Sequence, residues 1–477
     1  MLLLLSAFCA ALAPVASAQS VWGGTMSWTQ TGPKTVNVEV TRTIRRGLYP
    51  AVNVGDTINT GSLLNFGDAG LTAVNLVVTS IDAARDKMVT SGVFPHTYTF
   101  SGSGSFTAFT STCCRPAPLP ANGSSGIDMR LSAQVILAEN VPVRSSPRVY
   151  LPAQVLYAPT GAPLSFAIPA SDPDGDSFGY RFATTPESSL TTPIPTGATL
   201  DASTGVFTLP AQAAAIRQCV QVILDDGEGT SSVDMVFSFL GYATAPPAFT
   251  SLPAGRNVIG YIGQNTDFQI AAVDPELTPS DATDIVFGAL PPGLSLLSSV
   301  PSGANSNTRT LNMRWSPQPG QTTGASAMTF MAINPTGEAA LTTLTFTVVT
   351  PYAAWAATAF PAESLANQRE PGDDPDGDGT VNGLEFVTGG NPLVAAPLFT
   401  SERNATELIL SYPRRRSVPV GADRPQVSVD LTGWLPATGL QREVLPLDDT
   451  RDQIRLHLPL GPQAQQFLRV VFDEGAF

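Results

Sequence analysis

Thr35-Val-Asn-Val-Glu-Val-Thr41 alternates polar and apolar side chains, and Val74-Asn-Leu-Val-Val-Thr79 shows a similar pattern. Because successive side chains of a β-strand point to opposite faces of the sheet, this alternation is typical of half-buried strands. The chain also holds 41 glycines and 42 prolines, and only 13% of its 477 residues are charged. Such a composition is typical of short strands joined by many turns. We therefore predict a mainly β protein.

The length and the charge narrow the classes of protein further. A chain of 477 residues predicts three to four domains of ordinary size. The net charge of -14 argues against nucleic acid as a partner, because binding phosphates requires clustered Lys and Arg. An acidic surface suits a protein that collects divalent cations.

The first residues predict export from the cell. Met1-Leu-Leu-Leu-Leu5 opens an apolar run that ends in Ala16-Ser-Ala18, and this pattern is typical of a signal peptide over residues 1–18. No later stretch reaches the roughly 18 uninterrupted apolar residues of a membrane span. We expect a secreted or cell-surface protein without a transmembrane span.

Three cysteines follow the predicted cleavage point: Cys113, Cys114 and Cys219. An odd number in an exported chain leaves at least one thiol unpaired or shared with another chain. The two adjacent cysteines can bridge each other only through a strained local ring, and a longer-range bridge to Cys219 is the alternative. The spacing leaves both pairings open.

Residues 19–146 form the predicted N-terminal β-domain. Asn65-Phe-Gly-Asp68 precedes His96-Thr-Tyr98, and this pair of motifs resembles the surface module named for polycystic kidney disease protein (PKD). Ala69 stands where that family has a second glycine. The resemblance implies a β-sandwich in which His96 is structural.

Residues 147–242 form a second module. It contains, in order, Ala170-Ser-Asp-Pro-Asp-Gly-Asp176, Leu200-Asp-Ala-Ser-Thr-Gly-Val-Phe207 and Val220-Gln-Val-Ile-Leu-Asp-Asp-Gly-Glu-Gly229. This order resembles the cadherin-like and putative immunoglobulin-like modules of bacterial surface proteins. Residues 243–350 resemble the same template, through Ala271-Ala-Val-Asp274, Leu290-Pro-Pro-Gly-Leu294, Trp315-Ser-Pro317 and Ala332-Ile-Asn-Pro-Thr-Gly337. Two such modules of about 100 residues imply tandem β-sandwiches.

The composition changes after Pro351. Residues 352–360 and 382–387 can form helices, the second ending at Gly389. Strand-like runs return in residues 396–477, which resemble the C-terminal β-domain of surface proteins from Verrucomicrobia-type bacteria. The matching motifs are Tyr412-Pro-Arg-Arg415, Ser428-Val-Asp-Leu-Thr-Gly-Trp434 and Phe467-Leu-Arg469. The whole chain is thus predicted to consist of tandem immunoglobulin-like or cadherin-like β-sandwich modules, a short helical calcium-loop segment over 351–395, and a C-terminal β-domain.

The calcium loop is the most specific motif of the chain. Asp374-Pro-Asp-Gly-Asp-Gly-Thr-Val-Asn-Gly-Leu-Glu385 fits the twelve-residue loop with oxygen donors at positions 1, 3, 5, 7, 9 and 12 and glycine at position 6. Oxygen donors without His or Cys favour calcium over zinc. Pro361 and Pro371 interrupt the entering segment, so the loop resembles dockerin-type and thrombospondin type 3 loops as much as an EF-hand. The predicted ligands are Asp374, Asp376, Asp378, Thr380, Asn382 and Glu385.

A second candidate site lies in the second module. Asp172, Asp174 and Asp176 form a loop that Asp225 or Asp226 could join from the last strand, as the resemblance to cadherin-like modules implies. The alternative is a turn satisfied by its own backbone, because Asp and Gly are common turn residues. Asp274 and Glu276 retain only part of this motif, and we expect no ion there.

The sequence does not predict an enzyme. Its two histidines, His96 and His457, lie in strand-like segments, and nucleophile-elbow, zinc-protease and phosphate-loop motifs are absent. Neighbouring carboxylates such as Asp225 and Asp226 would point to opposite faces of a strand, which spoils a paired acid and base.

Two functions therefore compete. The first is a calcium-binding protein for cell adhesion or scaffolding that contacts other surface proteins. The alternative is a non-catalytic carbohydrate-binding protein that holds extracellular polysaccharide on exposed aromatic rings. Trp22, Trp28 and Trp434 are candidates for such a platform, although large aromatic side chains also fill sandwich cores.

Overall fold

The predicted signal peptide lies outside the part of the chain that the computed structural model describes. In that part the protein is mainly β with a few short helices, so the predicted fold class is confirmed. The described residues are 21–83, 85–116, 118–122, 127–139, 144–151, 155–242, 245–276, 283–288, 290–300, 306–317, 325–361, 368–460 and 466–473.

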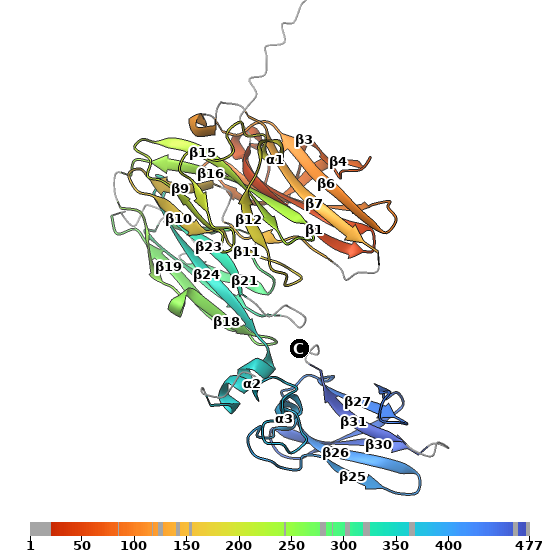
Figure 1. The fold of residues 1–477 in the computed structure, drawn as a ribbon. Coiled ribbons are helices and arrows are strands. Elements are labelled where there is room, and N and C mark those ends of the chain that lie inside the picture. Colours follow the sequence, from red (N-terminus) through yellow and green to blue (C-terminus); the bar gives the residue numbers. More distant parts are fainter. Residues whose placement is uncertain are drawn as a thin grey trace, which may run out of the picture. The chain divides into compact units, whose positions relative to one another are not determined.

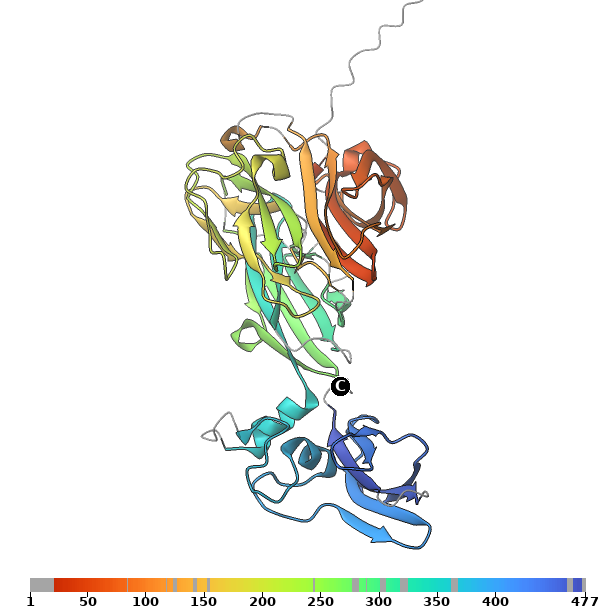
Figure 2. The same ribbon diagram turned by 45° about the vertical axis from the view of Figure 1, so that its right-hand side comes forward.

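The chain forms two compact units (Figure 1 and Figure 2). Within the described residues, the first unit contains 21–258, 267–314 and 325–346, and the second contains 259–266, 315–317 and 347–473. The predicted N-terminal domain and second module thus lie in one unit, together with most of the third module.

The N-terminal strands form one sheet in the order β1-β2-β5-β4-β3-β6-β7. The predicted strands at residues 35–41 and 74–79 lie in β2 and β4, where every second side chain is buried. A 3-10 turn, η1 (Arg46–Leu48), follows β2. The strands are β1 (Val21–Gly32), β2 (Thr35–Arg45), β3 (Thr57–Asn65), β4 (Leu71–Asp82), β5 (Lys87–Thr97), β6 (Ser103–Thr112) and β7 (Met129–Ala138).

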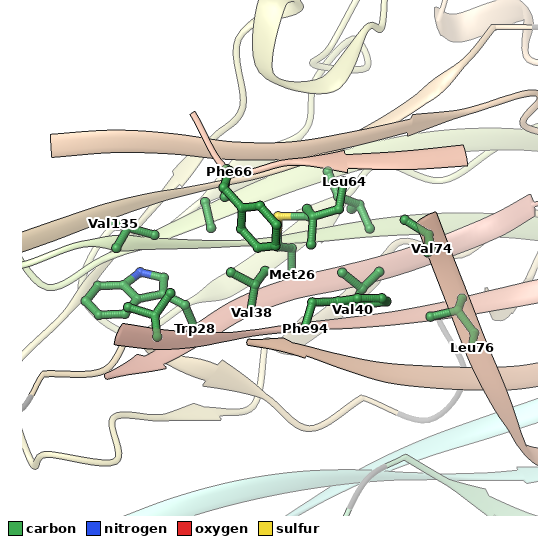
Figure 3. Close-up of a cluster of buried hydrophobic side chains, with 14 of the residues drawn as sticks. Met26, Trp28, Val38, Val40, Leu64, Phe66, Val74, Leu76, Phe94 and Val135 are labelled. Carbon is green, nitrogen blue, oxygen red and sulfur yellow. The ribbon is translucent and has the colours of Figure 1, made fainter. Parts of the chain in front are cut away.

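Side chains from these strands meet in one core (Figure 3). Val38 and Val40 of β2 lie near Leu64, Phe66 and Phe94. Trp28 is fully buried, and its Nε1 donates a hydrogen bond to the carbonyl of Gln134 at 2.9 Å. A buried indole requires such a partner for its N–H group.

The same sheet continues into the second module. Strand β1 pairs with β16, with Gly24 opposite Asp234, and β16 continues the sheet through β15 and β12. The far strand β7 also returns to this region, where Val135 forms an isolated bridge with Gly229. The strand pairing therefore crosses the predicted boundary at residues 146 and 147.

The second module completes its sandwich with a small sheet, β10-β14-β13, and β9 runs parallel to β16. Its core includes Phe166, Phe207 and Phe237. The elements of this region are η2 (Pro120–Asn122), β8 (Arg148–Val149), β9 (Val155–Pro159), β10 (Leu164–Ala167), β11 (Ala170–Ser171), β12 (Gly179–Phe182), α1 (Thr185–Ser188), β13 (Thr199–Leu200), β14 (Val206–Leu209), β15 (Ile216–Asp225) and β16 (Thr230–Leu240).

The third module has two four-stranded sheets, β17-β19-β22-β21 and β18-β24-β23-β20. The rings of Phe268 and Phe346, one from each sheet, lie 6.0 Å apart, so the sheets face each other as in a β-sandwich. The elements are β17 (Ala248–Ser251), η3 (Ala254–Arg256), β18 (Asn257–Tyr261), β19 (Thr266–Val273), β20 (Asp284–Phe287), β21 (Leu294–Val300), β22 (Thr308–Trp315), β23 (Ala325–Ile333) and β24 (Ala339–Val349).

The chain after the third module begins with two helices at the positions that the sequence predicts. Helix α2 (Pro351–Ala359) starts at Thr350, whose Oγ1 accepts a hydrogen bond from Ala353 N at 3.1 Å, and α3 (Asn382–Thr388) ends at Gly389 with φ +84°. Two sheets follow, β25-β26-β30-β29 and β28-β27-β31. Their strands are β25 (Thr400–Arg403), β26 (Glu407–Arg415), β27 (Asp423–Ser428), β28 (Leu435–Pro436), β29 (Gln441–Pro446), β30 (Arg451–Pro459) and β31 (Phe467–Phe472).

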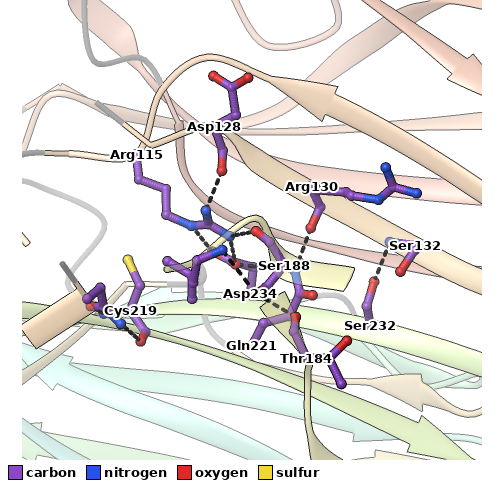
Figure 4. Close-up of polar contacts among 12 residues, drawn as sticks. Arg115, Asp128, Arg130, Ser132, Thr184, Ser188, Cys219, Gln221, Ser232 and Asp234 are labelled. Atoms are coloured by element: carbon purple, nitrogen blue, oxygen red, sulfur yellow. Dashed lines mark hydrogen bonds and ion pairs between the residues drawn. The ribbon is translucent and has the colours of Figure 1, made fainter. Parts of the chain in front are cut away.

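A buried ion pair joins the segment before β7 to the second module (Figure 4). Both side chains, Arg115 and Asp234, have no solvent exposure. Arg115 Nε donates to Asp234 Oδ1 at 3.2 Å, and its remaining nitrogens donate to Asp234 Oδ2 and to the carbonyls of Asp128 and Ser188. Gln221 Nε2 also donates to Asp234 Oδ2. The carboxylate and the guanidinium are therefore both satisfied without water.

Cys113 and Cys114 directly precede Arg115 in the sequence, and Cys219 lies near the ion pair in space. Cys113 and Cys114 form a disulfide with each other, and Cys219 is a buried free thiol. Cys219 N donates to Asn122 Oδ1 at 2.8 Å, and Asn122 Nδ2 donates to the carbonyl of Cys219 at 2.8 Å. Burial raises the pKa of the Cys219 thiol, which keeps it protonated and unreactive.

Asp234→Ala should destabilise the first unit by about 3–5 kcal/mol, because it leaves the Arg115 guanidinium buried without its counter-ion. Chemical denaturation of the mature protein, monitored by tryptophan fluorescence, measures the effect. Asp267→Ala is the matched control, since it breaks an Arg–Asp pair on the exposed surface and should leave the transition nearly unchanged. Equal effects of the two substitutions would show that the buried pair is not a structural centre.

Candidate metal centre

The loop at residues 374–385 is held in place by helix α3, which contains the last four residues of the loop. Leu384, Phe386 and Val387 of α3 are buried in the cores of the second unit. Because α3 is anchored on its apolar side chains, Glu385 is fixed beside the loop with only 1% of its surface exposed. The backbone locks the entry to the loop as well, since Asn382 N donates to the carbonyl of Asp373 at 2.8 Å.

The three aspartates converge. Oxygens of Asp374, Asp376 and Asp378 lie within 4.8 Å of one another. Backbone N–H groups hold their carboxylates in the loop: Asp374 accepts from Gly377 and Gly379, and Asp378 accepts from Thr380. Gly377 and Gly379 have φ values of +73° and +88°, a conformation that side chains with a Cβ rarely adopt. The glycines therefore permit the turn that gathers the carboxylates.

Two carboxylate oxygens in this loop have no protein partner. Asp376 Oδ2 and Glu385 Oε2 are buried and accept no hydrogen bond. Burial, together with the charges of Asp376, Asp378 and Asp374, raises the pKa of Glu385 to about 7. Buried carboxylates normally require a hydrogen bond or a cation. These residues fit a hard divalent cation, which would satisfy both oxygens and offset the repulsion.

The remaining two predicted ligands have structural tasks in the loop. Asn382 Nδ2 donates to the carbonyls of Gln368 and Glu370 and so ties the entering segment to α3. Asn382 Oδ1 is buried and accepts no hydrogen bond. Thr380 is buried, with its N–H directed to Asp378. One further contact was not foreseen: Ala396 N donates to Asp378 Oδ2 at 2.9 Å, which brings the segment after α3 back to the loop.

The entering side of the loop differs from that of a full helix-loop-helix. Residues 368–381 contain no α-helix, whereas α3 begins within the loop, at its ninth position. Gly383 N donates to the carbonyl of Pro371 at 2.9 Å, so the exit helix is braced by the entering chain itself. The geometry is that of a single loop attached to one short helix.

The aspartates of the second module also converge. Oxygens of Asp172, Asp174 and Asp176 lie within 4.8 Å of one another. Asp172 is 7% exposed; its Oδ1 accepts from the N–H groups of Asp174 and Asp176, and its Oδ2 is buried without a hydrogen bond. Burial raises the pKa of Asp172 to about 6, with a further contribution from the charge of Asp226.

The structure distinguishes the two aspartates that the sequence offered from strand β15. Asp226 Oδ2 is buried without a hydrogen bond, and its charge acts on Asp172. Asp225 is exposed, and its Oδ1 accepts from Gly227 N. Asp225 is the last residue of β15, whereas Asp226 lies just after the strand.

The histidines have structural partners. His96 Nε2 lies 2.8 Å from Asp68 Oδ2, and its ring stacks on Phe66 with centroids 4.0 Å apart. The Phe-Gly-Asp turn and the His-Thr-Tyr strand are therefore in contact, and Tyr98 Oη donates to the carbonyl of Phe66 at 2.9 Å. His457 Nδ1 lies 3.0 Å from Glu407 Oε2 on the neighbouring strand.

The N-terminal domain has relatives among integrin-like proteins. Residues 22–137 match the family model described as the N-terminal region of integrin beta-like proteins A–E. Integrin beta-like protein A of Dictyostelium discoideum is 26% identical over 217 residues, which cover 43% of this chain and 11% of that protein. The chain thus spans about a tenth of the length of this relative.

Solved structures of tandem immunoglobulin and cadherin domains match this chain with low TM-scores. The N-terminal Ig1-2 module of the Drosophila receptor protein tyrosine phosphatase DLAR is 15% identical with a TM-score of 0.20, covering 43% of this chain and 99% of that one. Domains 3–6 of protocadherin gamma B2 are 12% identical with a TM-score of 0.16, covering 69% of this chain and 78% of that one. At these scores the similarity adds nothing to what the strand topology shows.

Across the described residues, no helix has the length and apolar character needed to cross a membrane.

Glu385→Gln should abolish the stabilisation of the second unit by calcium. Without calcium the variant should melt at the same temperature as the wild type or higher, because it removes a buried charge that repels three aspartates. With 1 mM calcium only the wild type should gain stability. Differential scanning calorimetry with calcium and with a chelator measures both effects. Calcium stabilisation that persists in the variant would contradict Glu385 as a ligand.

Asp172→Asn should remove one calcium ion per chain while the loop at 374–385 keeps its own. Calcium titration by calorimetry should give a stoichiometry of about two for the wild type and about one for the variant. Asp225→Asn is the matched control, because Asp225 is exposed and should leave the stoichiometry unchanged. An unaltered stoichiometry in Asp172→Asn would leave its loop as a backbone-satisfied turn.

Proposed function

We propose that this chain is an extracellular calcium-binding protein that acts in adhesion or scaffolding. The single observation that carries the proposal is the match of residues 22–137 to the N-terminal region of integrin beta-like proteins. The tandem sandwiches support it, because modules of this kind typically present surfaces to partners and carry no catalytic machinery. Other surface proteins are the proposed partners.

Calcium is proposed as a structural ion. Asp378 accepts hydrogen bonds from Thr380 and from Ala396, so an ion held by its carboxylate would connect the loop with the chain on both sides of α3. The ligands would be Asp374, Asp376, Asp378, Glu385 and, through its carbonyl, Thr380, with Asn382 supporting the loop. The second ion would be held by Asp172, Asp174, Asp176 and Asp226.

The signal peptide and a source among bacterial surface proteins belong to the same proposal, as do the PKD-like and Verrucomicrobia-type assignments of the two end domains.

Carbohydrate binding is the second candidate function. Trp28 cannot form part of a platform, because it is fully buried. Trp434 is half-buried and stacks against Arg469, whose Cζ lies 4.1 Å from the ring centroid, and Leu431 and Leu435 beside it are exposed. A partly exposed ring that an arginine holds in place is suited to stack on a sugar.

Beads coated with the mature protein should bind cells or one another in calcium and separate when a chelator is added. The physical reason is that sandwich modules braced by ions present a fixed surface, whereas loosened loops do not. Glu385→Gln should weaken the binding, and Trp434→Ala should leave it unchanged. Submicromolar binding on a glycan array that Trp434→Ala removes, without bead association, would instead establish the carbohydrate-binding function.

A further inference from the structure

Lys87, the first residue of β5, is a buried cation without a carboxylate partner. It is 5% exposed, and its Nζ donates a hydrogen bond to Tyr157 Oη. Its Nζ also lies 4.2 Å from the centroid of the Tyr157 ring and 5.3 Å from that of Trp22. Among the described residues no carboxylate oxygen lies within 4.0 Å of this nitrogen. An ammonium group in such a place has lost its water and gained no counter-ion.

A small cavity of about 50 Å³ opens beside Lys87 within the first unit. Its polar side includes Asp82, Arg85 and Lys87 from the β4–β5 hairpin. Its apolar side is formed by residues of β9, β20 and β23: Val155, Val286, Phe287, Met331 and Ile333. The cavity thus places a cationic end opposite a hydrocarbon wall.

The charges around the cavity leave an excess of positive charge. Asp82 Oδ2 accepts from Arg85 Nη1 at 2.8 Å, and Arg85 Nη2 donates to the carbonyl of Asn334, so Asp82 is already paired. Arg85 Nε is buried and has no hydrogen-bond partner. Arg217 adds a further positive charge near Lys87. Burial raises the pKa of Tyr157 to about 12, so the phenol stays neutral. The group missing from this cluster is an anion.

We propose that this cavity binds a short-chain aliphatic monocarboxylate, with its carboxylate against Lys87 and Arg85 and its tail against Phe287 and Met331. Charge-assisted hydrogen bonds from Lys87 and Arg85 Nε would hold the two oxygens. The small volume excludes larger acids from full burial, and the apolar wall favours an alkyl tail over a bare inorganic anion.

The pH dependence of binding follows from the same contacts. The pKa of Lys87 is lowered to about 7, chiefly by burial; the charge of Asp82 opposes this shift, and the charges of Arg85 and Arg217 add to it. A carboxylate binds the protonated amine, so its affinity is full below pH 7 and falls about tenfold for each pH unit above it. The stability effect has the matching sign: with a folded pKa below the unfolded one, Lys87 costs stability below pH 7, and this cost disappears as the pH rises toward 10.5.

Propionate is the probe, and propionamide is its neutral isostere. Carbon-13 labels on the methionine methyl groups report from the cavity wall, because Met88 and Met331 both line it. Propionate should shift these two signals at millimolar concentration, and propionamide should bind at least tenfold more weakly. Lys87→Met should reduce propionate binding at least tenfold, whereas Lys34→Met, which alters an ion pair on the surface, should leave it unchanged.

Three outcomes would overturn the proposal: equal shifts by propionate and propionamide, equal competition by chloride, or unchanged binding in Lys87→Met. If Lys87→Met does not fold, the pH dependence of propionate binding to the wild type tests the proposal. Propionate affinity that stays constant between pH 6.5 and 8.5 would then exclude Lys87 as the binding cation.

Discussion

The first unit depends on the pairing of β1 with β16, in which Gly24 lies opposite Asp234. A Cβ on Gly24 would lie 2.5 Å from the carbonyl oxygen of Thr41 in β2 and 2.9 Å from Leu131 Cδ1 in β7, so glycine lets β1 approach these two strands closely. On the opposite strand, Asp234 pairs its backbone with Gly24 and directs its carboxylate to the buried Arg115. One position of β16 therefore fixes both the sheet that crosses two modules and the segment that leads into β7.

Because β1 pairs with β16, the predicted boundary between the N-terminal domain and the second module does not separate two independent sheets. The motifs of the second module are local, and Asp172, Asp201 and Asp226 indeed occupy successive turns around its strands. The alternation of β2 likewise predicts which valines face the core, because a strand side chain points to the side that its position dictates. The union of β1 with β16 could not be predicted in the same way. Backbone hydrogen bonds between strands about 200 residues apart leave no mark on the side-chain pattern.

The candidate metal sites show the same division between local and long-range information. The three aspartates at 374–378 and the glutamate at 385 follow from donor spacing, since a twelve-residue loop is a local structure. Other features of the two sites depend on which chain segments meet in space. Asp226, unlike Asp225, has a buried oxygen without a hydrogen bond. Ala396 donates a hydrogen bond to Asp378, and Asn382, a predicted ligand, also holds the segment that enters the loop. Lys87 is the extreme case. In the sequence it is one lysine in a polar turn, and only the contact with Tyr157 from another module reveals a buried cation.

The packing around α3 argues that the proposed calcium ion would stabilise the second unit and would not act as a switch. A switch requires an element with two arrangements that differ in their contacts with the ion. Leu384 and Phe386 lie on the same short helix as Glu385 and are buried in the adjoining cores, so moving the carboxylate away would expose apolar surface. Extracellular modules bind calcium with dissociation constants of about 10⁻⁴–10⁻³ M. At 1 mM calcium such a site adds roughly 0.4–1.4 kcal/mol to the free energy of unfolding. A gain of this size is too small to drive a rearrangement of the core.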